Sequence, residues 1–267
     1  MIYLETSGGL GNRLRAISSA IKLADEYGDR VFVIWKNTED CRCYYDDFFR
    51  MEAPNVIVLD ERKKELGCIN LLVWKWTVYT VRKKRFYKNE ECDKFLSEYK
   101  KCKFRRFVGW YIDTYEDFYE GTNYSFFPLK EEMVRKVRLN IDEVLKHDGR
   151  RIGLHIRRTD NDMSIELSPL YLFEDAITNE INYDSNTVFY LATDDPAIKV
   201  EFIQKYGARI ITDGIHAAVR NTRDGMEEAV IELFSLASMD KIIGSYWSSF
   251  SETAAKVGNI ELIQLKK

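Results

Sequence analysis

The stretch that decides the fold is residues 187–212, which read TVFYLATDDPAIKVEFIQKYGARIIT. The apolar run 187–192 predicts a buried strand. Asp195 and Pro196 predict the N-cap and first residue of a helix over 196–206. A second apolar run, 208–212, predicts the next strand. Strand, helix and strand joined by such short connections are typical of a parallel sheet covered by helices.

The same alternation extends along the chain on both sides of this stretch. Further strands are predicted at 2–5, 31–35, 56–59, 151–156, 241–244 and 260–265, and helices at 13–27, 130–146, 169–181, 225–238 and 249–257. Residues 60–125 have poor periodicity, and no element is assigned there. Asp148-Gly149-Arg150 is the best candidate hinge, so we predict two α/β halves, 1–148 and 149–267.

Composition excludes several classes of protein. The chain has 267 residues, 45% of them hydrophobic and 13% aromatic, and a net charge of −3. These values are ordinary for a globular protein and argue against disorder and against nucleic-acid binding by the whole chain. No apolar run approaches a membrane span, and no signal peptide is visible. The five cysteines are odd in number and fit no zinc spacing, so we expect reduced thiols in an intracellular setting.

Positive charge is concentrated in residues 62–106. This stretch holds 15 Lys and Arg against 5 Asp and Glu, a local charge of +10 that leaves −13 on the rest of the chain. Aromatic residues such as Trp74 and Phe104 are interleaved with the basic ones. The pattern fits a solvated face with its aromatics in the core, and it also fits contact with an anionic acceptor, a membrane surface or nucleic acid.

A glycine-rich segment, Ser7-Gly8-Gly9-Leu10-Gly11-Asn12-Arg13, lies between the first predicted strand and helix. Glycines at this place permit a tight turn and close approach of the backbone to a ligand. The segment is neither G-x-G-x-x-G nor a P-loop. A generic turn requires neither Asn12 nor Arg13, so both are candidate ligand contacts.

Three further segments follow predicted strands of the second half. The first is His155-Ile156-Arg157-Arg158-Thr159-Asp160, whose paired arginines fit phosphate oxygens. The second holds Asp194, which either bonds a nucleoside or orients an arginine. The third contains Ser248 and Ser249-x-x-Glu252, a capping box that marks a helix start and hence an anion site. Ligands of open parallel sheets bind beyond the carboxyl ends of strands, so the three together predict a diphosphate and nucleoside pocket.

These segments, in this order and spacing, resemble the three donor-binding motifs of α-1,6-fucosyltransferases and the wider superfamily that includes bacterial nodulation and protein O-fucosyltransferases. The Gly8–Arg13 segment resembles the N-terminal loop of the same superfamily. The likeness is good over about 150–258 and thin over 30–148. It implies an α/β, GT-B-like fold with two Rossmann-like lobes facing a cleft, residues 1–148 forming the acceptor side and 149–267 the donor side.

The resemblance further implies inverting transfer of fucose from GDP-fucose with no metal and no cofactor. Arg157 would hold the β-phosphate and stabilise the leaving diphosphate, and Arg158 would support that pocket. The remaining donor contacts would be His155, Asp194, Glu232, Ser248, Ser249, Gly11, Asn12 and Arg13. Glu232 takes a place where an Asp is usual and needs a one-residue gap to align.

The general base that removes the acceptor's proton is sought in the loop after the arginines. Glu166 and Asp162 are the candidates, and Glu166 is preferred. The same loop spells Asp160-Asn161-Asp162, the D-x-D pattern of metal-dependent glycosyltransferases. The adjacent arginines already supply positive charge, so we predict no metal.

The expected partners are a nucleotide-sugar donor and a glycan or lipid-linked glycan acceptor. We place the protein in the cytoplasm, with the stretch 62–106 in peripheral contact with the inner membrane. Three alternatives stay open: another nucleotide sugar as donor, a non-catalytic nucleotide or glycan binder, and a nucleic-acid binder acting through the basic stretch.

Overall fold

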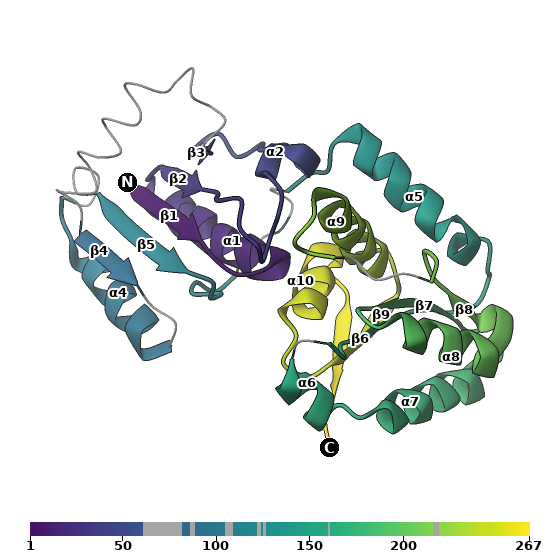
Figure 1. Ribbon diagram of the computed structural model, residues 1–267. Helices are drawn as coiled ribbons and strands as arrows, with labels where there is room; N and C mark the ends of the chain where they lie inside the picture. Colours follow the sequence, from purple (N-terminus) through teal and green to yellow (C-terminus); the bar gives the residue numbers. More distant parts are fainter. Residues whose placement is uncertain are drawn as a thin grey trace. The chain divides into compact units, whose positions relative to one another are not determined.

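The computed structural model describes residues 1–60, 82–85, 89–104, 109–121, 124, 127–159, 161–215 and 219–267, and of 82–85 and 89–90 it describes the backbone alone. The chain forms two compact units, Met1–Pro128 and Leu129–Lys267. Each unit is built on a five-stranded sheet in which every pair of neighbouring strands is parallel (Figure 1).

The first unit has the strand order β3-β2-β1-β5-β4. Its described elements are β1 (Ile2–Thr6), α1 (Leu10–Tyr27), β2 (Val31–Ile34), α2 (Tyr45–Phe48), β3 (Val56–Leu59), β4 (Arg82–Arg85), α4 (Asn89–Lys101) and β5 (Trp110–Thr114). Strands β2 and β3 lie on one side of β1, and the later strands β5 and β4 lie on its other side. The topological switch therefore lies between β1 and β5.

The second unit has the order β10-β9-β6-β7-β8. It contains α5 (Glu131–Leu145), β6 (Arg151–Ile156), α6 (Asp162–Leu167), α7 (Leu170–Tyr183), β7 (Val188–Thr193), α8 (Pro196–Tyr206), a 3-10 turn (Gly207–Arg209), β8 (Ile210–Ile211), α9 (Arg223–Ala237), β9 (Lys241–Ser245), α10 (Ser249–Gly258) and β10 (Glu261–Leu265). Helices α7 and α8 cover one face of the sheet, and α9 and α10 cover the other (Figure 1). The alternating α/β pattern predicted for this half is confirmed.

The switch point of the second sheet lies between β6 and β9. From β6 the chain proceeds to β7 and β8, and it then returns to the opposite side of β6 for β9 and β10. The loops that leave two such strands diverge to opposite faces of the sheet, which opens a crevice at their carboxyl ends. The predicted arginine and serine segments begin at the ends of these two strands.

The division between the units lies earlier in the chain than the sequence indicates. Helix α5 belongs to the second unit because its inner face, including Val137 and Ile141, is buried, and Asn140 Nδ2 donates to Tyr190 Oη of β7 at 2.7 Å. Gly149, the predicted hinge, lies within the second unit, where an added Cβ would be 2.2 Å from the carbonyl oxygen of Asn186. The division therefore falls after Pro128 rather than after residue 148.

The basic stretch 62–106 falls largely outside the described residues. Two of its aromatics, Phe95 and Tyr99, are buried in the first unit against Trp110, whereas Phe104 is exposed. Strand β4 consists of four basic residues and lies at the edge of its sheet. Charge on an edge strand prevents pairing with another molecule's edge, so part of the charge has a structural explanation.

No disulfide joins the cysteines that the structure describes, namely Cys41, Cys43, Cys92 and Cys102. The Sγ atoms of Cys41 and Cys43 lie 3.6 Å apart in the core of the first unit. Their hydrogen bond and their burial raise the pKa of the Cys43 thiol. A buried protonated thiol is a poor nucleophile and a poor metal ligand. Cys68 lies outside the described residues.

No described helix combines the length and the apolar composition that crossing a lipid bilayer requires.

Candidate functional site

Three predicted segments meet at the carboxyl edge of the second sheet. In the register of the sheet His155 pairs with Ala192 of β7 and with Gly244 of β9. One residue beyond β6, the amide of Arg157 donates to Ser245 Oγ at 3.0 Å. The segments after β6, β7 and β9 are therefore adjacent, as the sequence predicts.

Asp194 holds the loop that carries the arginines. Its Oδ1 accepts from the amide of Arg158 at 2.7 Å, and its Oδ2 accepts from Thr159 Oγ1 at 2.8 Å. The same carboxylate forms an ion pair with Arg157, with Nε and Oδ2 3.4 Å apart. These contacts support the second of the two roles predicted for Asp194, the orientation of an arginine.

The two arginines differ in how they are held. Arg158 donates from Nη2 to the carbonyl of Ser168 at 2.5 Å and from Nη1 to the carbonyl of Arg157 at 3.0 Å, and its guanidinium lies over the Phe173 ring. It therefore fastens the loop to the body of the unit. Arg157, ion-paired with Asp194 and with its side chain 19% exposed, is the arginine better placed to meet an anion.

His155 is enclosed beside Arg157. The residue is 5% exposed, and its ring stacks on Phe250 of α10 with centroids 5.0 Å apart. Burial, followed by the positive charge of Arg157, lowers the pKa of His155 to about 4, so the imidazole is neutral at physiological pH. Within the described parts of the chain its Nδ1 has no hydrogen-bond partner. A buried polar atom of this kind requires an explanation, and a bound polar molecule is one.

The N-terminus of α10 faces the same edge. The capping box predicted from Ser249 and Glu252 is wrong: the N-cap is Ser248, whose side chain makes no capping hydrogen bond. The Glu252 carboxylate instead accepts from Gln264 Nε2 on β10 at 3.1 Å. An N-terminus without a side-chain cap offers amides and the positive end of the helix dipole to an anion. Ser248 is buried and Ser249 is partly exposed there.

The two candidate bases lie on α6. Asp162 is in its first turn and Glu166 is one turn later, so both side chains are on the same exposed side of the helix. The structure ties α6 to the loop after β9, because Ser164 Oγ donates to the carbonyl of Tyr246 at 2.7 Å. Asp160 lies outside the described residues, which contain no cluster suited to a metal ion.

Glu232 of α9 lies in a buried cluster with Lys199 and Asp213. Its Oε1 is 3.3 Å from Lys199 Nζ, which also donates to Asp213 at 2.7 Å, and the Glu232 side chain is 8% exposed. Burial, and then the nearby Asp213 carboxylate, raise the pKa of Glu232 to about 8, although Lys199 opposes the shift. Burial and the Asp213 carboxylate therefore keep Glu232 largely protonated at neutral pH, against the opposing charge of Lys199.

Replacing Glu232 by glutamine is expected to remove a pH dependence of stability. The folded pKa of about 8 exceeds the ordinary 4.5, so this group stabilises the fold fully below pH 4.5 and loses that effect as pH rises toward 8. The lowered pKa of His155 has the opposite effect: it reduces stability only as the pH falls below 6.5, the ordinary pKa of histidine. Between pH 6.5 and 8 the free energy of unfolding of the wild type should thus fall by about 2 kcal/mol, whereas that of Glu232→Gln should not fall by this amount.

Thermal unfolding across this pH range measures the difference. Glu201→Gln, an exposed position on α8, is the matched control and should follow the wild type. Parallel curves for Glu232→Gln and the wild type would contradict the buried protonated carboxyl.

The glycine-rich segment forms the corresponding loop of the first unit, between β1 and α1. Gly8 has a φ of 73°, and an added Cβ would lie 2.7 Å from Asn12 Nδ2, so glycine is required there. Gly11 is buried and Asn12 partly buried in the first turn of α1. This loop sits at the switch point of the first sheet, the place where the fold opens a crevice.

Arg13 has a different role from the one predicted. It is fully buried, and it donates to the carbonyls of Gly8 at 2.8 Å and Lys36 at 2.6 Å and to Thr38 Oγ1 at 2.7 Å. Its guanidinium also lies over Trp35, 4.9 Å from the ring centroid. Arg13 therefore fastens two loops of the first unit and is not displayed to a donor.

Three polar side chains near this loop were not predicted as ligand contacts. Thr6 Oγ1, Ser7 Oγ and Asn37 Oδ1 are buried and lack hydrogen-bond partners among the described residues. Thr6 ends β1, Ser7 follows it, and Asn37 comes soon after β2. Their position after parallel strands was the available signal, but short polar residues at strand ends are too common to single out.

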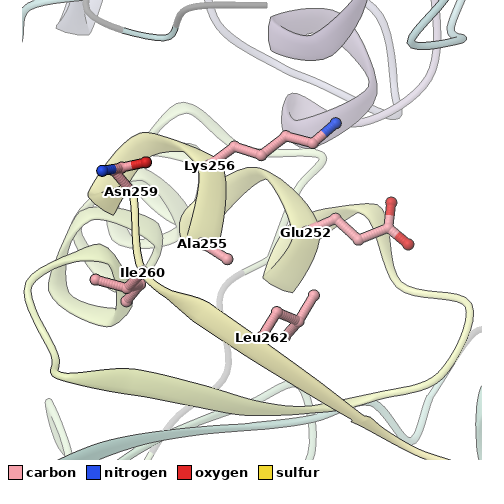
Figure 2. Close-up of a pocket in the computed structure, with 6 residues that line it drawn as sticks. All are labelled: Glu252, Ala255, Lys256, Asn259, Ile260 and Leu262. Carbon is pink, nitrogen blue, oxygen red and sulfur yellow. The ribbon is translucent and has the colours of Figure 1, made fainter. Parts of the chain in front are cut away.

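A separate hollow lies between α10 and β10, as Figure 2 shows. It is lined by Glu252, Ala255, Lys256, Asn259, Ile260 and Leu262. Most of this lining comes from the end of α10 and the start of β10, which is the amino end of the sheet. The hollow is therefore distinct from the edge that carries Arg157.

No protein-family model and no curated protein matches this chain. Solved structures of fucosyltransferases do match its fold. NodZ α-1,6-fucosyltransferase co-crystallized with GDP is 14% identical, with a TM-score of 0.61 over 95% of this chain and 91% of that one. An Arabidopsis thaliana FUT1 mutant in complex with GDP is 14% identical (TM-score 0.62, 98% and 69%), and POFUT1 in complex with GDP is 9% identical (0.62, 99% and 98%).

The chain thus has the α/β GT-B fold that these fucosyltransferases share, which confirms the fold predicted from the sequence. At such low identity the likeness establishes the architecture, and the chemistry has to be argued from the site.

Proposed function

We propose that this protein is an inverting fucosyltransferase whose donor is GDP-fucose. The observation that carries the proposal is the pairing of Arg157 with Asp194 beside the N-terminus of α10, at the switch point between β6 and β9. The site combines an oriented guanidinium with helix amides, which together suit a diphosphate. The GDP bound in the structural neighbours supports the same ligand class.

The chemistry requires negative charge to be stabilised as the sugar leaves. When the bond from the anomeric carbon to the β-phosphate breaks, that charge develops on the diphosphate. Arg157 and the first amides of α10 are fixed before the reaction, so they stabilise this charge with little reorganisation. Ser248 and Ser249 would add hydroxyl donors, and Arg158 would maintain the loop. With this positive charge supplied by the chain, the proposed mechanism needs no metal.

The nucleoside would be recognised away from the diphosphate. The neutral His155 has a buried Nδ1 without a partner among the described residues, and Glu232 keeps a carboxyl group that can donate as well as accept. Gly11 and Asn12 are proposed as donor contacts from the first unit. Glu166, with Asp162 as the second candidate, is proposed to take the proton from the acceptor hydroxyl.

Two other functions are distinguished by the identity of the ligand. Because arginine reads phosphate and not the hexose, the same site would also suit another nucleotide sugar. A non-catalytic nucleotide or glycan binder would show binding without turnover.

Contact of the stretch 62–106 with an anionic membrane is proposed separately. Lys83→Glu, Lys84→Glu and Arg85→Glu together should reduce liposome binding, and unchanged binding would refute that contact.

A thermal-shift panel tests the donor. The ligands are GDP, GDP-fucose, GDP-mannose, UDP, UDP-glucose and dTDP, each with and without EDTA. Ligand at about 100 times its Kd adds roughly 2.7 kcal/mol of stability. We expect GDP and GDP-fucose to raise Tm equally with and without EDTA. A rise in Tm with UDP or dTDP alone would show that the donor is a different nucleotide sugar. No rise in Tm with any nucleotide would refute the proposed donor site.

A further inference from the structure

Trp247 has an unusual backbone conformation. It follows β9 and directly precedes Ser248, the N-cap of α10, and its φ is 62°. Every other described residue with positive φ is a glycine, except Asn259, which ends α10. Left-handed φ is costly for a bulky side chain and is accepted by asparagine and glycine. Strain of this kind concentrates at functional sites.

The backbone around Trp247 is held by hydrogen bonds from neighbouring elements. Asn161 Nδ2 donates to the carbonyl of Trp247 at 3.1 Å. One residue earlier, Tyr246 is fixed at both ends: its amide donates to Ser168 Oγ at 2.8 Å, and its carbonyl accepts from Ser164 Oγ at 2.7 Å. The strained conformation is therefore imposed by the loop and by α6.

The Trp247 side chain does not compensate for the strain by packing in the core. The residue is 62% exposed, and its ring lies 6.0 Å from that of Tyr246 at 51°. Met163, on the α6 helix that holds this loop, is also 48% exposed. A large aromatic side chain on a held backbone thus faces solvent next to the N-cap of α10.

We propose that Trp247 is a stacking platform for a sugar ring of the acceptor. This inference rests on the proposed function, because the acceptor hydroxyl must approach the sugar carried on the diphosphate. One face of a pyranose presents C–H groups, which pack against the electron-rich face of an indole. A tryptophan on a held backbone has only two side-chain torsions to order, so it binds with a small loss of conformational freedom.

A nucleobase is the other ring in such a reaction that could stack on the indole, and it is the less suitable occupant. In a nucleotide sugar the base and the transferred sugar lie on opposite sides of the diphosphate. Trp247 adjoins the helix N-terminus proposed to bind the diphosphate, whereas buried groups such as His155 are available for the nucleoside. The experiment below separates the two occupants.

Saturation-transfer NMR with the full chain and GDP present tests the platform. The probes are the methyl glycosides of β-glucose, β-galactose, α-mannose and N-acetyl-β-glucosamine at millimolar concentration. Trp247→Gly removes the ring and relieves the strain, so its Tm should be no lower than that of the wild type. Trp247→Phe keeps an aromatic face. Tyr183→Ala removes a 79% exposed aromatic at the end of α7, on the opposite edge of the sheet, and is the matched control.

We expect at least one glycoside to bind the wild type, Trp247→Phe and Tyr183→Ala similarly and Trp247→Gly about tenfold more weakly, which corresponds to about 1.4 kcal/mol. The thermal shift by GDP should be the same in all four. Equal glycoside signals with Trp247→Gly, or none with the wild type, would overturn the platform. A weaker GDP shift in Trp247→Gly would assign the ring to the nucleotide. Absence of a GDP shift in the wild type would instead refute the proposed function.

Discussion

Arg157→Ala is expected to reduce turnover of GDP-fucose about a thousandfold while the protein remains folded. The guanidinium is oriented by Asp194 and only 19% exposed, so it would act on the leaving diphosphate in a poorly solvated place. Removing one pre-oriented donor to a developing oxyanion lowers kcat by about 10²–10³, and the loss of a full charge adds to that effect. Release of GDP, followed with a coupled assay, measures the change.

Two variants control for this result. Arg157→Lys keeps the charge and loses the planar fork, so its activity should lie between those of the wild type and the alanine variant. Arg151→Ala removes an arginine from the other end of the same strand, where it pairs with Asp240 at 2.8 Å, and should leave turnover unchanged. Turnover by Arg157→Ala at the wild-type rate would contradict the assignment of the leaving-group site.

Arg13→Ala is expected to destabilise the protein by about 4 kcal/mol. The change leaves the carbonyls of Gly8 and Lys36 and the hydroxyl of Thr38 without their donor, and it opens a cavity beside Trp35. Urea denaturation measures the loss. Arg30→Ala, at an exposed position in the same unit, should stay within about 0.5 kcal/mol of the wild type.

The Arg13 experiment also separates the two roles considered for this residue. A donor contact would give a variant that is as stable as the wild type and binds GDP more weakly. A structural residue gives a destabilised variant, and that is the result expected from three hydrogen bonds to two loops.

The second unit was predictable from the sequence because its signals are local. Asp195 accepts from the amide of Ala197 at 2.9 Å and Pro196 begins α8, as the residue types predict. The boundaries of β6 and β7 are set by apolar runs that end at a charged or polar residue. Parallel strands joined by helices then bring their carboxyl ends to one edge, which placed Arg157 and Asp194 together.

The first unit was less predictable because its pairing is not local. Strand β5 pairs with β1 from the far end of the unit, and β4, Arg82–Arg85, contains no apolar residue. Its place in the sheet depends on β5 rather than on its own periodicity. The first residue of α10, Ser249, agrees with the prediction, but the N-cap is Ser248 rather than Ser249 because two serines compete for that role and Glu252 bonds Gln264.

In the candidate site, the sequence predicts which segments meet but not which way their side chains point. Sequence identifies arginines that follow strands, but it does not show where a guanidinium points. Arg13 and Arg158 donate hydrogen bonds to backbone carbonyls, whereas Arg157 is paired with Asp194 at the switch point. Trp247 directly precedes the predicted serine segment, yet only the structure reveals its positive φ and its exposure.

A crystal structure with GDP tests the central claim most directly. The account predicts diphosphate density within hydrogen-bond distance of the Arg157 guanidinium and the first amides of α10, with the nucleoside toward His155. Diphosphate density away from this edge, for example in the hollow between α10 and β10 (Figure 2), would contradict it.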